Sequence, residues 1–191
     1  IESPRGLRAP LISRVRVEMR TLSGSGLVLE PQRVQHADEM FRVLSDPAIY
    51  RHLDDRAPAS IEALADRYRR LETRRSADGA QVWLNWVIRS RSEGPIGYVQ
   101  ATVFQDCSAS IAFVIGSRWW GKGFGRTATS LMLAELADHY GVRVAYATAS
   151  AANARSISML RALGFSEREP DSYPHGPVST GDVLMVRREQ A

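Results

Sequence analysis

The residues from Ile111 to Arg126 restrict the fold more than any other part of the chain. Residues 111–115 alternate β-branched or aromatic side chains with small ones, which predicts a strand. A turn with three alternate glycines follows at residues 121–125, and apolar residues then recur at helical spacing over residues 128–140. We therefore expect a strand, a glycine turn and a helix that begins just after Gly125.

The glycine turn has the features of an anion-binding site. Gly121, Gly123 and Gly125 let the backbone come close to a ligand, and the free N–H groups and positive dipole end of the following helix attract phosphate. Lys122 and Arg126 add side-chain cations beside those donors. We predict a phosphate cradle. The alternative is a tight turn that carries two solvated basic side chains.

Two common phosphate motifs do not fit. The Walker pattern G-x-x-x-x-G-K-[ST] matches Gly116, Gly121 and Lys122, but Gly123 offers no hydroxyl for magnesium. The dinucleotide pattern G-x-G-x-x-G fails because Gly125 comes one residue early, and no acidic residue ends a strand about twenty residues further on.

Composition indicates one soluble globular domain. The chain has 191 residues, 44% hydrophobic and 24% charged, with a net charge of +4 and a pI near 9.6. Lys122 is the only lysine, and the arginines are scattered without an aromatic stripe, which does not favour nucleic acid as a partner. The lone Cys107 excludes an internal disulfide framework and fits a reducing, cytoplasmic location. The apolar runs are too short for a membrane span, and no residues have metal-ligand spacing, so we expect no metal.

Turn residues and apolar periodicity divide the chain into an irregular N-terminal extension (residues 1–26), with a short strand at Val15–Met19, and one domain (residues 27–191). Further strands are expected at Leu27–Pro31, Val82–Arg89, Ile96–Phe104, Val142–Thr148 and Val183–Arg187. Further helices are expected at Ala37–Leu44, from an N-cap at Ser60 through Arg75, and at Asn153–Leu163. Hairpins followed by a strand–helix–strand unit predict an α/β (α+β) fold with a mixed, mostly antiparallel sheet and helices on both faces.

The glycine turn resembles the acyl-CoA pyrophosphate loop of the GNAT superfamily of N-acetyltransferases, written [QR]-x-x-G-x-[GA]. Arg118, Gly121 and Gly123 match it literally. We prefer the later register, with Gly123 and Gly125 at the small positions. Trp120 then stands where Gln or Arg is usual, as in the ribosomal-protein (Rim-type) branch, whose loop often runs W-G-K-G-[YF].

A second motif supports the resemblance. Asn153-x-x-Ser156, followed by Leu160-x-x-Leu163-Gly164-Phe165, is similar to the family's N-x-x-[SA] helix and its L-G-F ending. The predicted order of elements is also that of the GNAT fold. The resemblance spans about Leu27 to Arg188 and implies a splayed pair of central strands.

The resemblance also implies an activity, in which acetyl-CoA as co-substrate gives its acetyl group to a primary amine, either a protein N-terminus or a small amine. It implies a homodimer as one possible assembly. The residues that it assigns to the cofactor are Phe113, Val114, Ile115, Trp120, Gly121, Lys122, Gly123, Phe124, Gly125, Arg126 and Asn153.

Catalysis would use a backbone N–H near Val114 or Ile115 as the oxyanion donor. Many GNAT enzymes place a thiolate-protonating Tyr where this chain has Leu160, so Ser156 is the candidate acid. A Glu that Rim-type proteins often carry before the loop is replaced by Ser110. The remaining candidates for the base are Asp106, Asp54, Asp55, His52 and His175, and the alternative is a water relay, because an N-terminal amine has a pKa near ~8.

Two other functions stay open at this stage. A non-catalytic acyl-CoA-binding regulatory module would also keep the cradle, and an RNA-associated protein would use the arginine-rich N-terminal extension. The loops at His52–Ala57 and Pro170–Gly181 are where we expect acceptor choice to reside.

Overall fold

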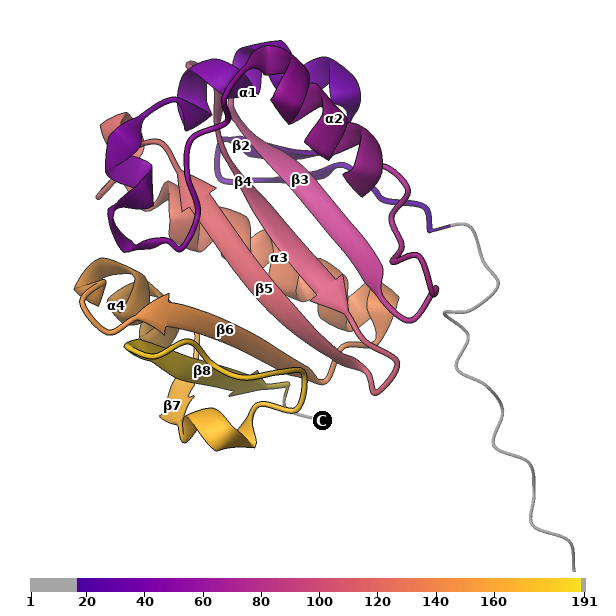
Figure 1. The fold of residues 1–191 in the computed structure, drawn as a ribbon, viewed down its shortest axis with the longest axis vertical. Helices are drawn as coiled ribbons and strands as arrows, with labels where there is room; N and C mark the ends of the chain where they lie inside the picture. Colours follow the sequence, from indigo (N-terminus) through magenta and orange to yellow (C-terminus); the bar gives the residue numbers. More distant parts are fainter. Residues whose placement is uncertain (1–16, 190–191) are drawn as a thin grey trace, which may run out of the picture.

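A computed structural model describes residues 17–189. One eight-stranded sheet, in the order β1-β2-β3-β4-β5-β6-β8-β7, runs through the molecule (Figure 1). The strands are β1 (Leu22–Gly24), β2 (Leu27–Pro31), β3 (Val82–Ser90), β4 (Gly94–Val103), β5 (Ser108–Ile115), β6 (Val144–Ser150), β7 (Ser166–Arg168) and β8 (Asp182–Arg188). The helices are α1 (Ala37–Leu44), α2 (Ile61–Leu71), α3 (Phe124–Tyr140) and α4 (Ala154–Ala162), with short 3-10 segments at Val34–His36, Pro47–His52, Ser117–Trp119 and Pro170–Ser172.

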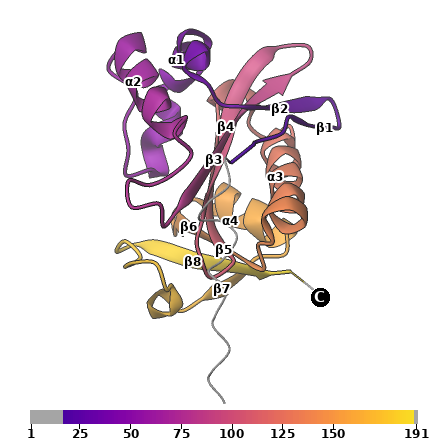
Figure 2. The same ribbon diagram turned by 90° about the vertical axis from the view of Figure 1, so that its right-hand side faces the viewer.

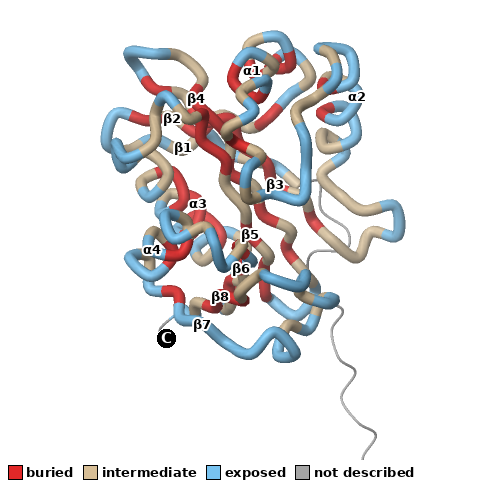
Figure 3. The backbone as a smooth tube through the Cα atoms, turned by 60° about the vertical axis from the view of Figure 1, so that its left-hand side comes forward, coloured by how far each residue is buried: buried red, intermediate tan, exposed pale blue. Residues whose placement is uncertain are grey.

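Helices cover both faces of the sheet, as the hydrophobic pattern predicts. Figure 2, with the sheet nearly edge-on, shows α1 and α2 on one side and α3 on the other. The larger apolar cluster joins one face of β2–β6 to α3 and α4, and includes Met132, Leu136 and Leu160. The smaller cluster joins the opposite face to α1 and α2, and includes Met40, Leu64 and Val114. The buried parts of the trace follow the central strands and the inner side of α3 (Figure 3).

The strands β5 and β6 are the only parallel neighbours in the described sheet, and they diverge. Their pairing covers three positions, Ser108 with Val144 through Ser110 with Tyr146. Beyond these positions β5 continues to Ile115 beside β4, and β6 continues to Ser150 beside β8. The two strands therefore splay towards their carboxyl ends (Figure 1), which confirms the splayed pair that the sequence resemblance implies.

A β-bulge lies in β4 beside the splay. The pairing of β3 with β4 shifts between Ile88 and Arg89, which leaves Ile96 as the extra residue. Gly97 follows it, and a Cβ there would lie well under 3.0 Å from the carbonyl oxygen of Val114. Only glycine allows β4 and β5 to approach this closely.

Several predicted boundaries are wrong by a few residues. Leu22–Gly24 forms a hairpin with β2 across the glycine-rich joint, so the sheet begins inside the predicted N-terminal extension. Residues 17–19 of the strand predicted at Val15–Met19 are not a strand, and Val15 and Arg16 lie outside the described residues. α2 ends at Leu71 rather than Arg75, because Arg74 has a left-handed φ of 58°.

Candidate active site

The glycine turn leads directly into α3. Gly123 is the N-cap of the helix in the left-handed region (φ 81°), so α3 begins at Phe124, two residues earlier than predicted. Gly121 is also left-handed (φ 76°), and a Cβ on either glycine would meet nothing within 4 Å. Backbone N–H groups therefore border open space at the positive end of a 17-residue helix.

Gly125 allows close packing rather than a left-handed turn. It lies inside α3, and a Cβ there would come within 3.2 Å of the Met159 sulfur and 3.5 Å of Cγ1 of Ile115. The missing side chain lets α3 pack against both α4 and the end of β5. This contact fixes the cradle relative to the splayed strands.

Glu93, at the β3–β4 turn, forms ion pairs with two basic side chains of the loop. Its carboxylate lies 3.9 Å from Nζ of Lys122 and 3.6 Å from the Arg118 guanidinium, and it accepts a hydrogen bond from Nε1 of Trp119 (2.6 Å). Sequence reasoning missed this residue, since only tertiary structure brings the turn to the cradle. Two cations of the loop, Lys122 and Arg118, are thus paired with one carboxylate.

Asp46 ties the α1–α2 connection to the start of the loop. Its carboxylate accepts hydrogen bonds from the backbone N–H groups of Ser117 and Ala48, both at 3.0 Å. The bonds from Ser117 and then from Ala48 outweigh the effect of burial and hold the pKa of Asp46 below its usual value.

Trp120 connects the loop, β5 and α4. Its indole N–H donates to the carbonyl oxygen of Ile115 (2.7 Å), and the guanidinium of Arg155 lies over its ring at 4.2 Å from the centroid. Arg155 belongs to the first turn of α4, so this contact brings that turn to the carboxyl end of β5. One side of the Trp120 ring is occupied by a residue that the sequence motifs did not single out.

The β4–β5 register determines which way the backbone of β5 faces. The N–H of Gly116 donates to the carbonyl of Ile96 (3.0 Å), just beyond the ladder. Hydrogen-bonded and non-hydrogen-bonded pairs alternate in an antiparallel ladder. Val114 lies two residues before Gly116, so it forms a hydrogen-bonded pair with Tyr98. The residues on either side of Val114 direct their N–H and C=O groups away from β4.

These neighbouring residues are Phe113 and Ile115, and their peptide groups face the region where β6 has diverged. Trp120 already uses the carbonyl of Ile115. The N–H of Ile115 and the N–H and C=O of Phe113 therefore border the splay, a few residues before the cradle. Between the two residues that sequence reasoning left open, this geometry favours Ile115 over Val114 as the oxyanion donor.

Asn153 and Ser156 lie together at the start of α4. The side-chain oxygen of Asn153 caps the helix by accepting the backbone N–H of Ser156 (3.2 Å). Among residues 17–189, the structure gives the Ser156 hydroxyl no protein hydrogen-bond partner. Leu160 is fully buried in the larger cluster, so that position is purely apolar here.

Asp106 and His175 lie at the opposite end of β5. Asp106 and Nε2 of His175 both contact the Ser108 hydroxyl, at 2.6 and 2.7 Å. Burial opposes ionisation of Asp106, but the hydrogen bonds from Ser108 and the nearby His175 hold its pKa below the usual value. Ser108 and Ile115 are roughly 23 Å apart along an extended strand. Neither group can take a proton directly from an amine beside Ile115.

The other candidate bases lie in the connection before α2. Asp55 pairs with Arg67 of α2 at 3.4 Å, whereas His52 and Asp54 belong to the adjoining surface. No group of three or more His, Cys, Asp or Glu residues within 17–189 could hold a metal ion. In the same part of the chain, no helix is long and apolar enough to cross a bilayer.

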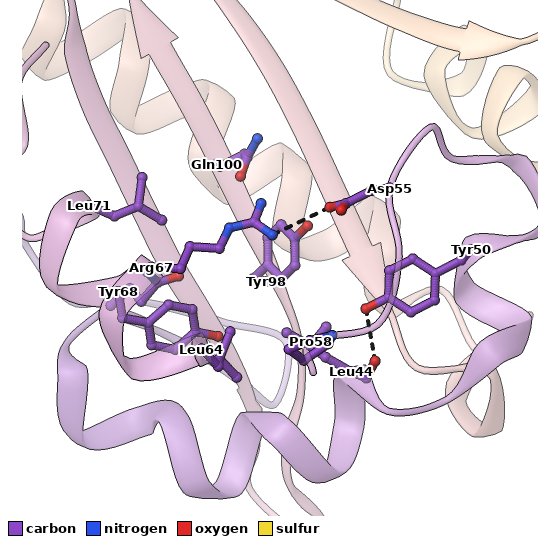
Figure 4. Close-up of a pocket in the computed structure, with 11 residues that line it drawn as sticks. Leu44, Tyr50, Asp55, Pro58, Leu64, Arg67, Tyr68, Leu71, Tyr98 and Gln100 are labelled. Carbon is purple, nitrogen blue, oxygen red and sulfur yellow. Dashed lines mark hydrogen bonds and ion pairs between the residues drawn. The ribbon is translucent and has the colours of Figure 1, made fainter. Parts of the chain in front are cut away.

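A pocket lies on the α1–α2 face of the sheet (Figure 4). Tyr98 and Gln100 of β4 line one side, Tyr68 and Arg67 of α2 line another, and Asp55 lies at the edge. Sequence reasoning expected acceptor choice in the loop that contains Asp55, which lines this pocket together with strand residues that it did not single out. Their alternation on the helix-covered face of β4 was the available signal.

Comparison with known proteins identifies the family. The family model described as "Acetyltransferase (GNAT) domain" matches residues 26–166, which is most of the chain. The chain belongs to the GNAT acetyltransferase family. It is therefore an acyl-CoA-dependent N-acetyltransferase by family, and no curated protein sequence matches it.

Solved GNAT structures share the fold. RimL, a ribosomal L7/L12 α-N-protein acetyltransferase in complex with coenzyme A, has a TM-score of 0.74 and 16% identity over 88% of this chain and 98% of that chain. The ribosomal-protein-S5-alanine acetyltransferase from Vibrio fischeri has a TM-score of 0.72 and 17% identity, covering 89% and 97%. A spermidine N-acetyltransferase SpeG chimera from Vibrio cholerae and hSSAT has a TM-score of 0.66 and 19% identity, covering 86% and 96%. These neighbours show that the fold of this GNAT chain is shared by Rim-type and spermidine acetyltransferases.

Proposed function

We propose that this GNAT protein transfers the acetyl group of acetyl-CoA to a primary amine by direct attack in a ternary complex. The observation that supports this proposal most directly is the early end of the β5–β6 ladder. It leaves the peptide groups of Phe113 and Ile115 facing the splay, next to an open glycine cradle. These features supply donors for an extended chain and for a pyrophosphate in one continuous path.

The residues fit the cofactor in three parts. The pyrophosphate would be held by the backbone of residues 121–126 at the α3 N-terminus, with Lys122 and Arg126 as mobile cations. Phe113 and Ile115 would bond the pantetheine arm, with the side chain of Val114 on the acceptor side. Trp120 and Asn153 would shape the site indirectly, because one fixes Ile115 and the other caps α4.

The reaction would proceed through an oxyanion at the thioester carbonyl. The neutral amine attacks the carbonyl carbon, a C–N bond forms, and the N–H of Ile115 stabilises the negative oxygen. The C–S bond then breaks, and the Ser156 hydroxyl gives its proton to the departing thiolate. A water chain removes the proton from the attacking amine and restores the serine.

Calorimetric titration of acetyl-CoA, CoA and NAD, followed by a thiol-release assay with a panel of amines, tests this function. We expect acetyl-CoA and CoA to bind, NAD not to bind, and at least one amine to release CoA. Binding without release for every amine would favour the regulatory-module alternative. No binding of acetyl-CoA would overturn the proposal.

The substitution Ser156→Ala tests the proposed acid. We expect kcat to fall about 100-fold, the low end for loss of a general acid, with the Kd of acetyl-CoA unchanged. The α4 cap uses the backbone N–H of Ser156, so it survives the substitution and thermal stability should not change. An unaltered kcat with an N-terminal amine would show that the thiolate leaves without this hydroxyl.

Glu93→Gln tests whether the carboxylate competes with the cofactor for Lys122 and Arg118. Glutamine keeps an acceptor for Trp119 but releases both cations, so CoA should bind about two- to fivefold more tightly at low salt, as expected for exposed ion pairs. The gain should shrink at high salt, because these charges are screened. Weaker CoA binding by the variant would instead mean that Glu93 positions the cations productively.

A further inference from the structure

The two groups that the proposed chemistry uses lie on opposite sides of the splay. Ile115, the proposed oxyanion donor, ends β5, and Ser156, the proposed acid, lies in the first turn of α4, which follows β6. The ladder between β5 and β6 stops at Ser110 and Tyr146. Ladder hydrogen bonds therefore do not set the separation of the two groups, although the reaction requires both at one thioester.

Apolar packing holds the inner side of α4 but not the outer side of its first turn. Ile157 and Leu160 are buried in the larger apolar cluster. In the first turn, Ala154 and Arg155 are exposed. The cap at Asn153 is a bond within the end of the helix, so it does not tie the turn to β5. A connection between this turn and β5 therefore has to come from its side chains.

Arg155 and Trp120 make such a connection at the open end of the splay, where α4 lies (Figure 1). The Arg155 guanidinium lies 4.2 Å from the centroid of the Trp120 ring and is attracted to its electron-rich face. The indole N–H at the edge of the same ring donates to the carbonyl oxygen of Ile115 at 2.7 Å. These two contacts in series, here called the clasp, connect the residue beside Ser156 to the oxyanion donor.

Arg155 has no competing ion pair among the described residues. Within residues 17–189, no carboxylate pairs with its guanidinium, so the Trp120 ring is the group that holds it. Arg161 of the same helix differs, because its guanidinium pairs with Glu167 at 3.2 Å. No ion pair in the described part of the chain therefore draws Arg155 away from the ring.

Resting on the proposed function, we propose that Arg155 and Trp120 are positioning residues, which set the distance between the N–H of Ile115 and the hydroxyl of Ser156. When the clasp is formed, the oxyanion donor and the acid face the same thioester from the two sides of the splay. When the clasp opens, the first turn of α4 shifts relative to β5, and the acid no longer reaches the departing thiolate.

The substitution Arg155→Met tests this inference, because methionine keeps an apolar stem against the ring but lacks the charge. We expect kcat to fall about fivefold, since an exposed cation–π contact shifts a two-state population by up to about that factor. The Kd of acetyl-CoA and Tm should not change, because Arg155 is exposed and lies outside the cradle. Steady-state kinetics with the most active amine of the panel, calorimetric titration and thermal unfolding measure the three quantities.

A double-mutant cycle shows whether Arg155 acts through the acid. In the Ser156→Ala background there is no hydroxyl to place, so Arg155→Met should have little further effect on kcat. Additive losses would mean that Arg155 acts elsewhere and would overturn the inference. Trp120→Phe keeps a ring under Arg155 but loses the N–H that donates to Ile115, so kcat should fall here too. An unchanged kcat in this variant would also count against the clasp.

Arg161→Met is the matched control, since Arg161 lies in the same helix and its exposed pair with Glu167 is far from the clasp in sequence. Its loss should change neither kcat nor Tm. Weaker acetyl-CoA binding by Arg155→Met would make Arg155 a cofactor ligand, and an unaltered kcat in Ser156→Ala would leave no acid to place. Either result would overturn the inference while the acetyltransferase function stands. Failure of every amine to release CoA would instead remove the proposed function, and this inference with it.

Discussion

Replacing Gly123 by aspartate is expected to weaken acetyl-CoA binding by on the order of 100-fold, equivalent to about 2.8 kcal/mol. Gly123 is the left-handed N-cap of α3, and its Cβ position opens onto the cradle with nothing within 4 Å. A carboxylate there would face the pyrophosphate and repel it, and it would compete for the same N–H groups. Isothermal titration of acetyl-CoA measures the loss.

The matched control is Gly79→Asp. Gly79 is also left-handed (φ 71°) and also has open space around its Cβ position, but it lies in the turn before β3. It therefore reports the backbone strain of aspartate at positive φ without the charge at the cradle. If both variants bound acetyl-CoA like the unaltered protein, the glycine turn would not hold the pyrophosphate.

Replacing Gly97 by alanine is expected to destabilise the fold by about 3 kcal/mol, as for overpacking in a rigid site, and to weaken acetyl-CoA binding as well. The added methyl group would collide with the carbonyl oxygen of Val114 and with the Cα of Ile115, which are backbone atoms that cannot rotate away. β5 must then move at the residue whose N–H we assign to the oxyanion. Urea unfolding and acetyl-CoA titration together measure both effects.

Gly24→Ala is the control for that experiment. Gly24 is also a strand glycine, but its added Cβ would meet only the side chain of Leu131, at 3.0 Å, which can adjust its rotamer. Its stability should stay within about 1 kcal/mol of the starting value. Equal stability of the two variants would mean that the close approach of β4 and β5 is not rigid.

Local patterns predicted most of the fold. Leu27–Pro31 and Ala37–Leu44 were predicted with the boundaries that the structure shows, because proline or a polar cap ends each run. Errors occurred where backbone conformation overrides side-chain pattern. The helix predicted through Arg75 ends at Leu71, before Arg74 adopts a left-handed φ. The Ser-Gly joint that suggests flexibility is the turn of a hairpin.

The candidate site was predicted only in part, for a related reason. A motif written along the chain can locate the cradle, since Gly121, Gly123 and Lys122 are nearly adjacent. It cannot reveal Glu93, which reaches the cradle from a distant turn, or Arg155, which reaches the Trp120 ring from α4. The pairing register between β4 and β5 also decides which peptide groups of β5 face the splay. This register depends on both strands, so the sequence of β5 alone does not specify it.

The three-position ladder between β5 and β6 has a consequence for how the molecule holds together. Within the sheet, the part that contains β1–β5 and the part that contains β6, β8 and β7 are joined by those few pairs alone. A cofactor lying in the splay would act as a missing strand and add a second link to the apolar cluster that already joins the two parts. Binding of acetyl-CoA there would stabilise the native state by mass action, so the unfolding temperature should rise with acetyl-CoA concentration.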